Sequence, residues 1–242
     1  MHVYPVNKLQ GANIIGNVLE YSNVRNVFHN YLKHRAYFPI GGSPFITVDW
    51  SSPVNADTII IGDTNCIAVS VLITYETGIQ DNKIINPHEN QLFNFIDTNK
   101  DYLIKNIRFD FTPIENNERP YVGYLFTGNK IVIPRFVTFP QWETQIRGES
   151  ERTNDGQSYG IILPTLEKFT AQFVRIYDVE KKIVDDYVQS VQTVIAHVID
   201  PYPEAHENVP PKYATLTKGI NNTKRDENNF YWNFDLEWME AR

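Results

Sequence analysis

Apolar residues recur along this chain mostly with a period of two, the spacing of β-strands that are buried on one face. The segment Ile67–Tyr75 shows this alternation, and Phe230–Trp238 shows it most clearly. One side of the latter carries large apolar groups, namely Phe230, Trp232, Phe234, Leu236 and Trp238. Because this much apolar surface must be covered, we expect the segment to close a sheet. The pattern predicts a mainly β fold.

One stretch has the spacing of a helix instead, with apolar residues in steps of three and four. These residues are Val179, Ile183, Tyr187, Val188 and Val191. Asp178 precedes them and is placed to cap the helix. The apolar run Thr193–Ile199 then stops at Asp200 and Pro201, which predicts a buried strand ended by a rigid turn. The C-terminal part is therefore predicted to be α+β.

Turn signals suggest how the chain divides. Tyr121–Phe126 and Lys130–Ile133 are predicted to form a hairpin across the turn at Thr127–Asn129. The polar stretch Arg147–Gln157 is predicted to be a mobile loop. Because prolines punctuate the chain shortly before this loop, we place a domain boundary there. A β-sandwich is predicted over residues 1–139, and a smaller β-rich α+β assembly domain with one helix over residues 140–242.

Charge and composition exclude several classes of protein. The chain has 242 residues and a formal charge of −7, which argues against a nucleic-acid partner. Its single cysteine, Cys66, excludes an intrachain disulfide and a cysteine-rich zinc site. No apolar run approaches the roughly 20 residues of a membrane-spanning helix, and the first residues lack the pattern of a secretory signal. We therefore expect synthesis in the cytoplasm without export and without membrane insertion.

Catalytic motifs are missing from the sequence. Gly148–Arg152 lacks the second glycine of a nucleophile elbow, and no glycine-rich phosphate loop occurs. A glycosidase needs two carboxylates across a cleft, and an acidic cluster could supply them: Glu143, Glu149, Glu151 and Asp155. A solvated loop explains the same residues more simply. We predict no enzyme, no catalytic residue and no cofactor.

Metal sites are not predicted either. Asp97–Asp101 begins like a calcium-binding EF-hand loop, but Tyr102 replaces the required glycine and Arg108 the final carboxylate. His29 and His34 lie five residues apart, which does not match the spacing of a zinc pair on a helix.

Other reactive or sugar-stacking side chains have ordinary explanations. His197 stands in an apolar strand and is predicted to be a hydrogen-bonded core residue. Cys66 is predicted to be a small buried residue. The first fifty residues are rich in rings that could stack on sugars but are predicted mostly in core or interface: Tyr31, Tyr37, Phe38, Phe45 and Trp50. Residues that bind a ligand remain undetermined by the sequence.

The order of three segments, Ile46–Trp50, Ala56–Asn65 and Ile67–Tyr75, resembles the first half of discoidin-like (galactose-binding-like) β-sandwich domains. Ile104–Phe111 looks like the strand of that family that carries an arginine between apolar residues. The resemblance covers about residues 12–135 and implies an N-terminal jelly-roll sandwich. The disulfide-closed extracellular members differ from this chain, so their ligands do not transfer to it.

Within that group the chain is most similar to domains of tailed-bacteriophage structural proteins, through Ala56–Asn65 and the segment Pro120–Asn129. The resemblance implies a virion component in or near the tail tip, with a second part like the units of tail tubes and hubs. Its implied partners are other tail proteins, further copies of the chain and a host-surface glycan.

Three functional hypotheses follow. The first is a non-enzymatic structural component of a phage virion that acts through protein assembly. The alternative is a carbohydrate-binding, lectin-like protein. The third is a glycan-cleaving enzyme that uses the acidic cluster around Glu149.

Overall fold

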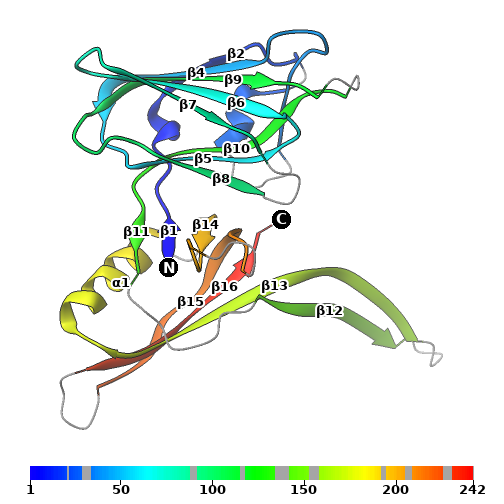
Figure 1. Cartoon of the computed structure of the whole chain (residues 1–242). Helices are drawn as coiled ribbons and strands as arrows, with labels where there is room; N and C mark the ends of the chain where they lie inside the picture. The colour runs from blue at the N-terminus through cyan, green and yellow to red at the C-terminus, as the bar shows by residue number, and fades with distance from the viewer. Residues whose placement is uncertain are drawn as a thin grey trace.

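Two β-rich bodies, one above the other, make up the chain (Figure 1). The computed structural model describes residues 1–20, 22–28, 34–87, 92–114, 118–133, 142–152, 158–191, 195–204, 209–225 and 231–241; for 146–152, 158–164 and 221–225 it describes the backbone. The first body is a β-sandwich, and the second is a seven-stranded sheet with a helix on one face. The predicted mainly β fold with an N-terminal sandwich is confirmed.

The strands are β1 (His2–Tyr4), β2 (Asn13–Gly16), β3 (Ala36–Tyr37), β4 (Phe45–Val54), β5 (Thr58–Thr64), β6 (Ala68–Tyr75), β7 (Gln80–Ile85), β8 (Phe93–Asp97), β9 (Ile104–Thr112), β10 (Tyr121–Gly128), β11 (Ile131–Val132), β12 (Glu143–Arg152), β13 (Ser158–Ile176), β14 (His197–Asp200), β15 (Lys212–Arg225) and β16 (Trp232–Glu240). The helices are α1 (Asp178–Val191) and the short 3-10 turns η1 (Lys8–Gly11) and η2 (Val24–Phe28).

A five-stranded sheet of order β2-β4-β9-β6-β7 faces a four-stranded sheet of order β3-β10-β5-β8 in the sandwich. Strand β6 buries every second residue, as the alternation predicts. Val71 pairs with Phe109 of β9, and both side chains are fully buried between the sheets. The period-two pattern thus marks the inner face of the sandwich.

The second body contains the sheet β11-β1-β14-β15-β16-β13-β12. Strand β16 lies between β15 and β13 and buries Phe234, Leu236 and Trp238. The predicted closing role of the C-terminal segment is confirmed. Helix α1 covers this apolar face with Tyr187 and Val191.

The predicted hairpin after Tyr121 is wrong. Strand β10 pairs with β5 and β3, whereas β11 pairs with β1. Close packing at Gly128 explains the difference, because a Cβ atom there would lie 2.4 Å from the backbone oxygen of Val6. The carbonyl of Gly128 also accepts a hydrogen bond from the N–H of Asp57 at 3.1 Å. The chain therefore leaves the sandwich at this point instead of turning back along β10.

Consequently β1 and β11, which precede residue 139, belong to the sheet of the second body. The chain crosses between the bodies twice, once after β1 and once after β10 (Figure 1). The domain boundary between residues 139 and 140 stays a prediction. The sheet of the second body also contains β1 and β11, which come from before that boundary.

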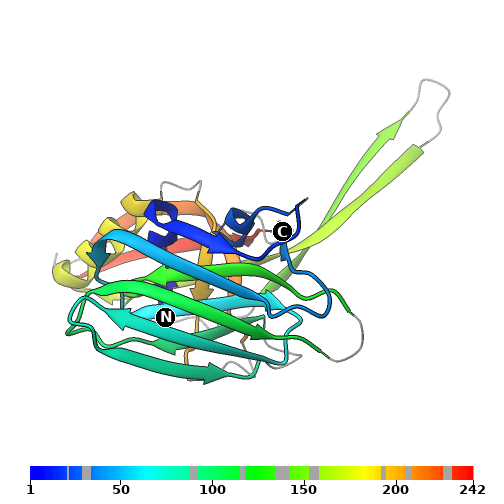
Figure 2. The same ribbon diagram turned by 90° about the horizontal axis from the view of Figure 1, so that it is seen from above.

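The loop predicted over Arg147–Gln157 is wrong for Arg147–Arg152, which lie in strand β12. Thr153–Gln157 lie outside the described residues. Strand β13 supplies the reason, because its backbone pairs with β12 as far as Ser158 opposite Arg152. Regular backbone hydrogen bonding thus overrides the polar composition. We call Thr144–Arg152 together with Ser158–Glu167 the arm; it extends away from both bodies (Figure 2).

Candidate functional site

A cluster of rings and charges lies at the edge of the four-stranded sheet, where β3, β5 and β10 meet. Arg35 donates two hydrogen bonds to the carboxylate of Asp63, at 2.7 and 2.9 Å. Its guanidinium carbon lies 4.1 Å from the centre of the Tyr121 ring, which in turn lies 5.9 Å from the Tyr37 ring. We call these four residues the ring cluster; it combines a bidentate ion pair with a cation–π contact.

The backbone around Asp63 has an unusual shape that makes the ring cluster possible. Asp63 has a φ of 49°, a left-handed conformation that few residues other than glycine adopt. Its carboxylate lies over Gly123 of β10, where a Cβ atom would come within 2.4 Å of Oδ2. The missing side chain at Gly123 therefore leaves the space in which Asp63 turns toward Arg35.

Partial exposure makes the ring cluster available to a ligand. The side chain of Arg35 is 35% exposed, and that of Asp63 is 13% exposed. Hydrogen bonding to Asp63 raises the pKa of Arg35, so the guanidinium stays charged. Partial burial, then the negative charge of Asp63, raises the pKa of Tyr121, so its hydroxyl stays protonated. The cluster can offer N–H and O–H donors beside aromatic surface to a polar ligand.

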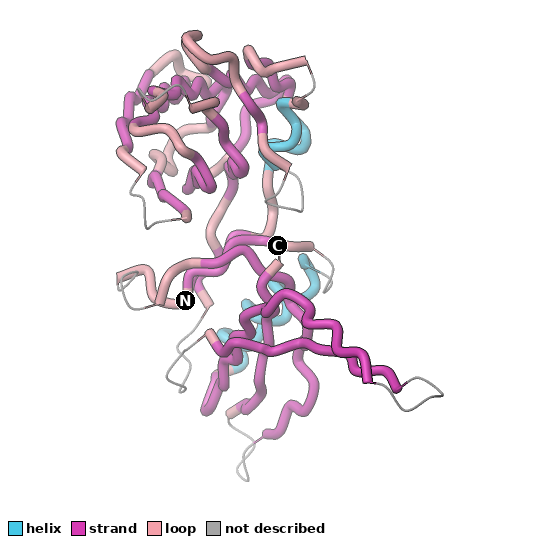
Figure 3. Tube along the Cα trace, turned by 90° about the vertical axis from the view of Figure 1, so that its right-hand side faces the viewer, coloured by secondary structure: helices cyan, strands magenta, loops and turns pink. Residues whose placement is uncertain are grey.

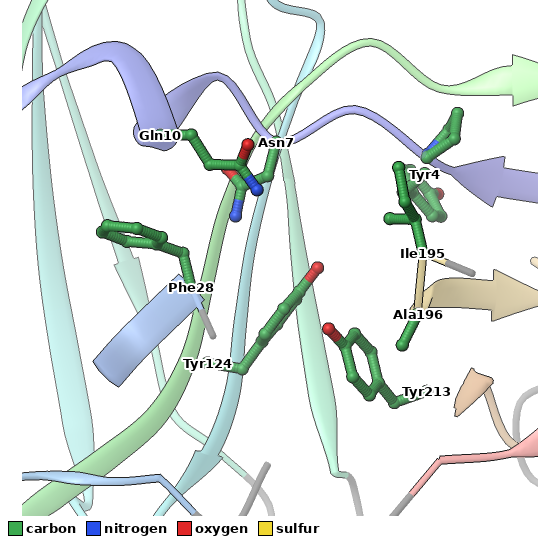
Figure 4. Close-up of a pocket in the computed structure, with 9 residues that line it drawn as sticks. Tyr4, Asn7, Gln10, Phe28, Tyr124, Ile195, Ala196 and Tyr213 are labelled. Atoms are coloured by element: carbon green, nitrogen blue, oxygen red, sulfur yellow. The ribbon is translucent and has the colours of Figure 1, made fainter. Parts of the chain in front are cut away.

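A second feature is a small hollow between the two bodies (Figure 4). Tyr124 of the sandwich and Tyr213 of the second body meet there, with ring centres 5.1 Å apart. Tyr4 from β1 lies close by and packs edge-on against Phe126 at 5.8 Å. The hollow has a volume of about 20 Å³, room for roughly one water molecule. These rings hold the two bodies together and leave little space for a ligand.

A third feature is a buried chain of hydrogen bonds in the second body. Trp238 donates its indole N–H to the hydroxyl of Tyr187 at 2.7 Å. That hydroxyl lies 2.7 Å from Nε2 of His197, while Nδ1 of the same ring lies 2.9 Å from the carbonyl of Ile195. The carbonyl can only accept, so Nδ1 carries the proton and Nε2 accepts from Tyr187. Burial lowers the pKa of His197 to about 4, which keeps the ring neutral.

The core assignments made for two residues are confirmed. His197 is buried and hydrogen-bonded as described. Cys66 is 3% exposed, and burial raises the pKa of its thiol.

The candidate metal positions do not assemble into a site. Asp101 donates its backbone N–H to Oδ1 of Asn99, which makes Asp97–Asp101 a polar turn between β8 and β9. His34 is exposed, and His29 lies outside the described residues. Within the ranges that the structure describes, no three histidine, cysteine, aspartate or glutamate side chains gather around a common point.

The described members of the acidic cluster share a single strand. Glu143, Glu149 and Glu151 all lie along one strand, β12, and Asp155 is outside the described residues. A glycosidase needs carboxylates on opposite sides of the scissile bond. The part of the cluster that the structure describes therefore adds no support to the glycan-cleaving hypothesis.

Among the described residues, no helix has the length and apolarity needed to cross a membrane.

The aromatic residues of the N-terminal stretch have different positions. Phe38 and Trp50 are buried, and Trp50 donates its indole N–H to the carbonyl of Lys8 at 3.0 Å. Tyr37 belongs to the ring cluster. Arg35 and Asp63 were not predicted as site residues, because they lie 28 positions apart in the sequence and no local motif connects them.

Comparisons with known proteins add a weak similarity of fold. No family model and no curated protein matches the chain. The module CpGH89CBM32-4 produced by Clostridium perfringens is similar at 14% identity and a TM-score of 0.43, covering 51% of this chain and 98% of its own. The lectin domain of lectinolysin, complexed with Lewis B antigen, is 7% identical with a TM-score of 0.44, covering 52% and 99%.

A Ruminococcus gnavus GH29 fucosidase in complex with fucose is 12% identical with a TM-score of 0.46, covering 52% of this chain and 27% of its own. At such identities and TM-scores, the similarity identifies neither a ligand nor a binding residue of this chain.

Proposed function

We propose that this chain is a non-enzymatic structural protein that joins a larger assembly through its arm. The observation that carries the proposal is the backbone pairing of the arm. At Lys168, strand β13 pairs with both neighbours, Glu143 of β12 and Met239 of β16, and from there to Ile176 it pairs with β16. From Glu167 to Ser158 the pairing recorded for β13 is with β12. The arm is thus a two-stranded ribbon beyond the sheet (Figure 3).

A two-stranded ribbon is marginally stable in water by itself, since it has no second layer on which to pack. Among the strands that the structure describes, only β13 pairs with β12, so the outer edge of β12 presents backbone N–H and C=O groups that a further strand can bind. Both properties favour a partner that covers or extends the ribbon. The two bodies, held together by Tyr4, Tyr124 and Tyr213, provide a rigid base for it.

In its finer form, the proposal is that the assembly is a bacteriophage virion, in or near the tail tip. Support for this step comes from the sequence resemblance of Ala56–Asn65 and Pro120–Asn129 to phage structural proteins.

The test is the size of the purified protein in solution, measured by chromatography with light scattering. The wild-type chain should form a defined oligomer. A variant in which Asn-Gly replaces residues 146–165 shortens the arm to a tight hairpin, and it should be monomeric with an unchanged thermal midpoint. Ile84, which is 68% exposed on the sandwich, supplies the control, because Ile84→Ser should leave the oligomer intact. A wild-type chain that stays monomeric at every concentration would contradict the proposal.

A second candidate function is carbohydrate binding by the sandwich, favoured by the ring cluster. Sugars need hydrogen-bond partners beside an aromatic surface, and Arg35, Tyr37 and Tyr121 offer both. Immobilised glycans should retain the wild-type chain, whereas Tyr121→Ala should lose this retention. The matched control is Tyr177→Ala, because Tyr177 is 54% exposed on the second body. Equal retention of all three proteins would exclude the ring cluster as the sugar site.

A further inference from the structure

The outer strand of the arm offers a long sheet edge. Strand β12 ends the seven-stranded sheet, and within the described part of the chain it pairs with β13 only. Its ten residues exceed the typical strand length of about five or six. Natural proteins usually shorten or cover such edges, because exposed backbone groups recruit other strands. An extended edge on a projecting ribbon is therefore suited to pairing with a further strand.

The charged residues of β12 on the two sides of Gly148 are complementary to each other. Arg147 and Glu149 carry opposite charges one position on either side of Gly148. If two copies of the strand run antiparallel with Gly148 opposite Gly148, each Arg147 comes opposite Glu149 of the second copy. Opposite charges on directly facing residues stabilise a strand pair, and like charges destabilise it.

The two neighbouring twofold registers are less favourable at the axis. Centring the pair on Glu149 places the two glutamates opposite each other there, although Arg147 then faces Glu151, and centring it on Arg147 places the two arginines opposite each other. The bulge between Gln145 and Arg147 interrupts β12 on one side of the centre. Regular pairing about Gly148 is therefore short, so the charges next to it decide the register.

We infer that the partner of the arm is a second copy of this chain, bound through antiparallel pairing of β12 with β12 about Gly148. The inference rests on the proposed assembly function and names its partner and register. The pairing is isologous, so it joins two seven-stranded sheets into one continuous sheet across a twofold axis.

Cysteine cross-linking tests the register. In a Cys66→Ser background, Gly148→Cys places two thiols opposite each other at the twofold axis, where facing Cα atoms lie about 4.5–5.5 Å apart. Mild oxidation should give a covalent dimer. Ser150→Cys is the matched control, because its two copies would lie four residues apart along the strands and should remain uncrosslinked. Efficient dimers from Ser150→Cys without dimers from Gly148→Cys would overturn the register.

Charge reversal tests the same pairing without a cysteine. Arg147→Glu and Glu149→Arg each create like-charge contacts and should weaken dimerisation at least tenfold, more strongly at low salt. The double variant restores opposite charges and should regain dimerisation. If the wild-type chain associates through its arm but these variants have no effect, the pairing is wrong and the assembly function stands. If the arm-shortened variant associates like the wild type, the assembly function itself fails.

Discussion

At the scale of single residues, Gly123 determines whether the ring cluster can form. Besides the close approach to Oδ2, a Cβ atom at this position would lie 3.0 Å from Cβ of Asp63, which a side-chain rotation cannot relieve. We expect Gly123→Ala to lower the free energy of unfolding by about 1–3 kcal/mol, the usual cost of overpacking. Denaturant unfolding measures the change. Gly11→Ala should be nearly neutral, since no atom lies within 4 Å of its added Cβ. Equal effects of both substitutions would contradict the packing argument.

His197 gives the protein a predictable sensitivity to acid. Its pKa is lowered to about 4 by burial, against about 6.5 in the unfolded chain. Between these values the unfolded state binds more protons, so stability is complete above about pH 6.5 and falls as the pH drops toward 4. At roughly 1.4 kcal/mol for each pH unit, the loss reaches about 3 kcal/mol.

Unfolding free energies measured from pH 7 to pH 4 should show this fall in the wild-type chain. His197→Gln should reduce the slope, because one proton is no longer taken up on unfolding. His34→Gln serves as the control, since His34 is exposed and lies outside the buried chain of hydrogen bonds through Tyr187. A slope unchanged in His197→Gln would assign the acid sensitivity to other groups.

Local sequence was sufficient to predict that His197 and Cys66 are buried, because His197 stands in an apolar run and a cysteine without an adjacent histidine is by default a small apolar residue. It was insufficient for the ring cluster. Asp63 lies in β5 and Arg35 immediately precedes β3, and their meeting depends on the sheet order and on the space above Gly123. Such long-range contacts leave no periodic signal in the sequence.

At the scale of elements, helix α1 shows how periodicity predicts a helix but not its buried face. The helix spans Asp178–Val191 as expected, yet Val179 is 75% exposed and Ile183 39% exposed, while Val184 is fully buried. Val179 and Ile183 are not part of the buried core of the second body, whereas Val184, Tyr187 and Val191 are. Only the later turns contact the core around Tyr187.

This difference predicts unequal effects of two otherwise identical substitutions. Val184→Ala removes buried methyl groups and leaves a cavity, so we expect a loss of about 1–2 kcal/mol in unfolding free energy. Val179→Ala changes an exposed residue and should remain within about 0.5 kcal/mol of wild type. Chemical denaturation of both variants decides the matter. A larger loss for Val179→Ala would mean that the apolar stripe predicted from sequence is the buried one.

The arm is the element that composition predicts least well. A polar, glycine-containing stretch is typical of a loop, but antiparallel pairing requires only backbone groups, which every residue except proline supplies. The same reasoning explains the failed hairpin after Tyr121. Turn residues at Thr127–Asn129 are compatible with a reversal, but tight packing at Gly128 directs the chain into the second sheet.

At the scale of the whole molecule, the two bodies are connected through the N-terminal segment. Strand β1 lies between β11 and β14 in the second body, so the first residues of the chain complete a sheet built mainly from its last third. Asn7 then fastens the crossing to the sandwich, where its side chain donates to the carbonyl of Leu125 at 2.8 Å and accepts from the N–H of Thr127 at 3.2 Å.

Because β1 is an internal strand, a substitution near the N-terminus should destabilise the C-terminal body. Val3 is fully buried in the core shared with Trp238, whereas Val6 is 53% exposed. Val3→Asp buries a charge in apolar surroundings and should cost at least about 3 kcal/mol, whereas Val6→Asp should cost little. Three of the four tryptophans, Trp142, Trp232 and Trp238, follow residue 139, so their fluorescence reports mainly on the second body. In Val3→Asp the fluorescence transition should move to lower denaturant concentration. If it coincided with the wild-type transition, strand β1 would not stabilise the second sheet.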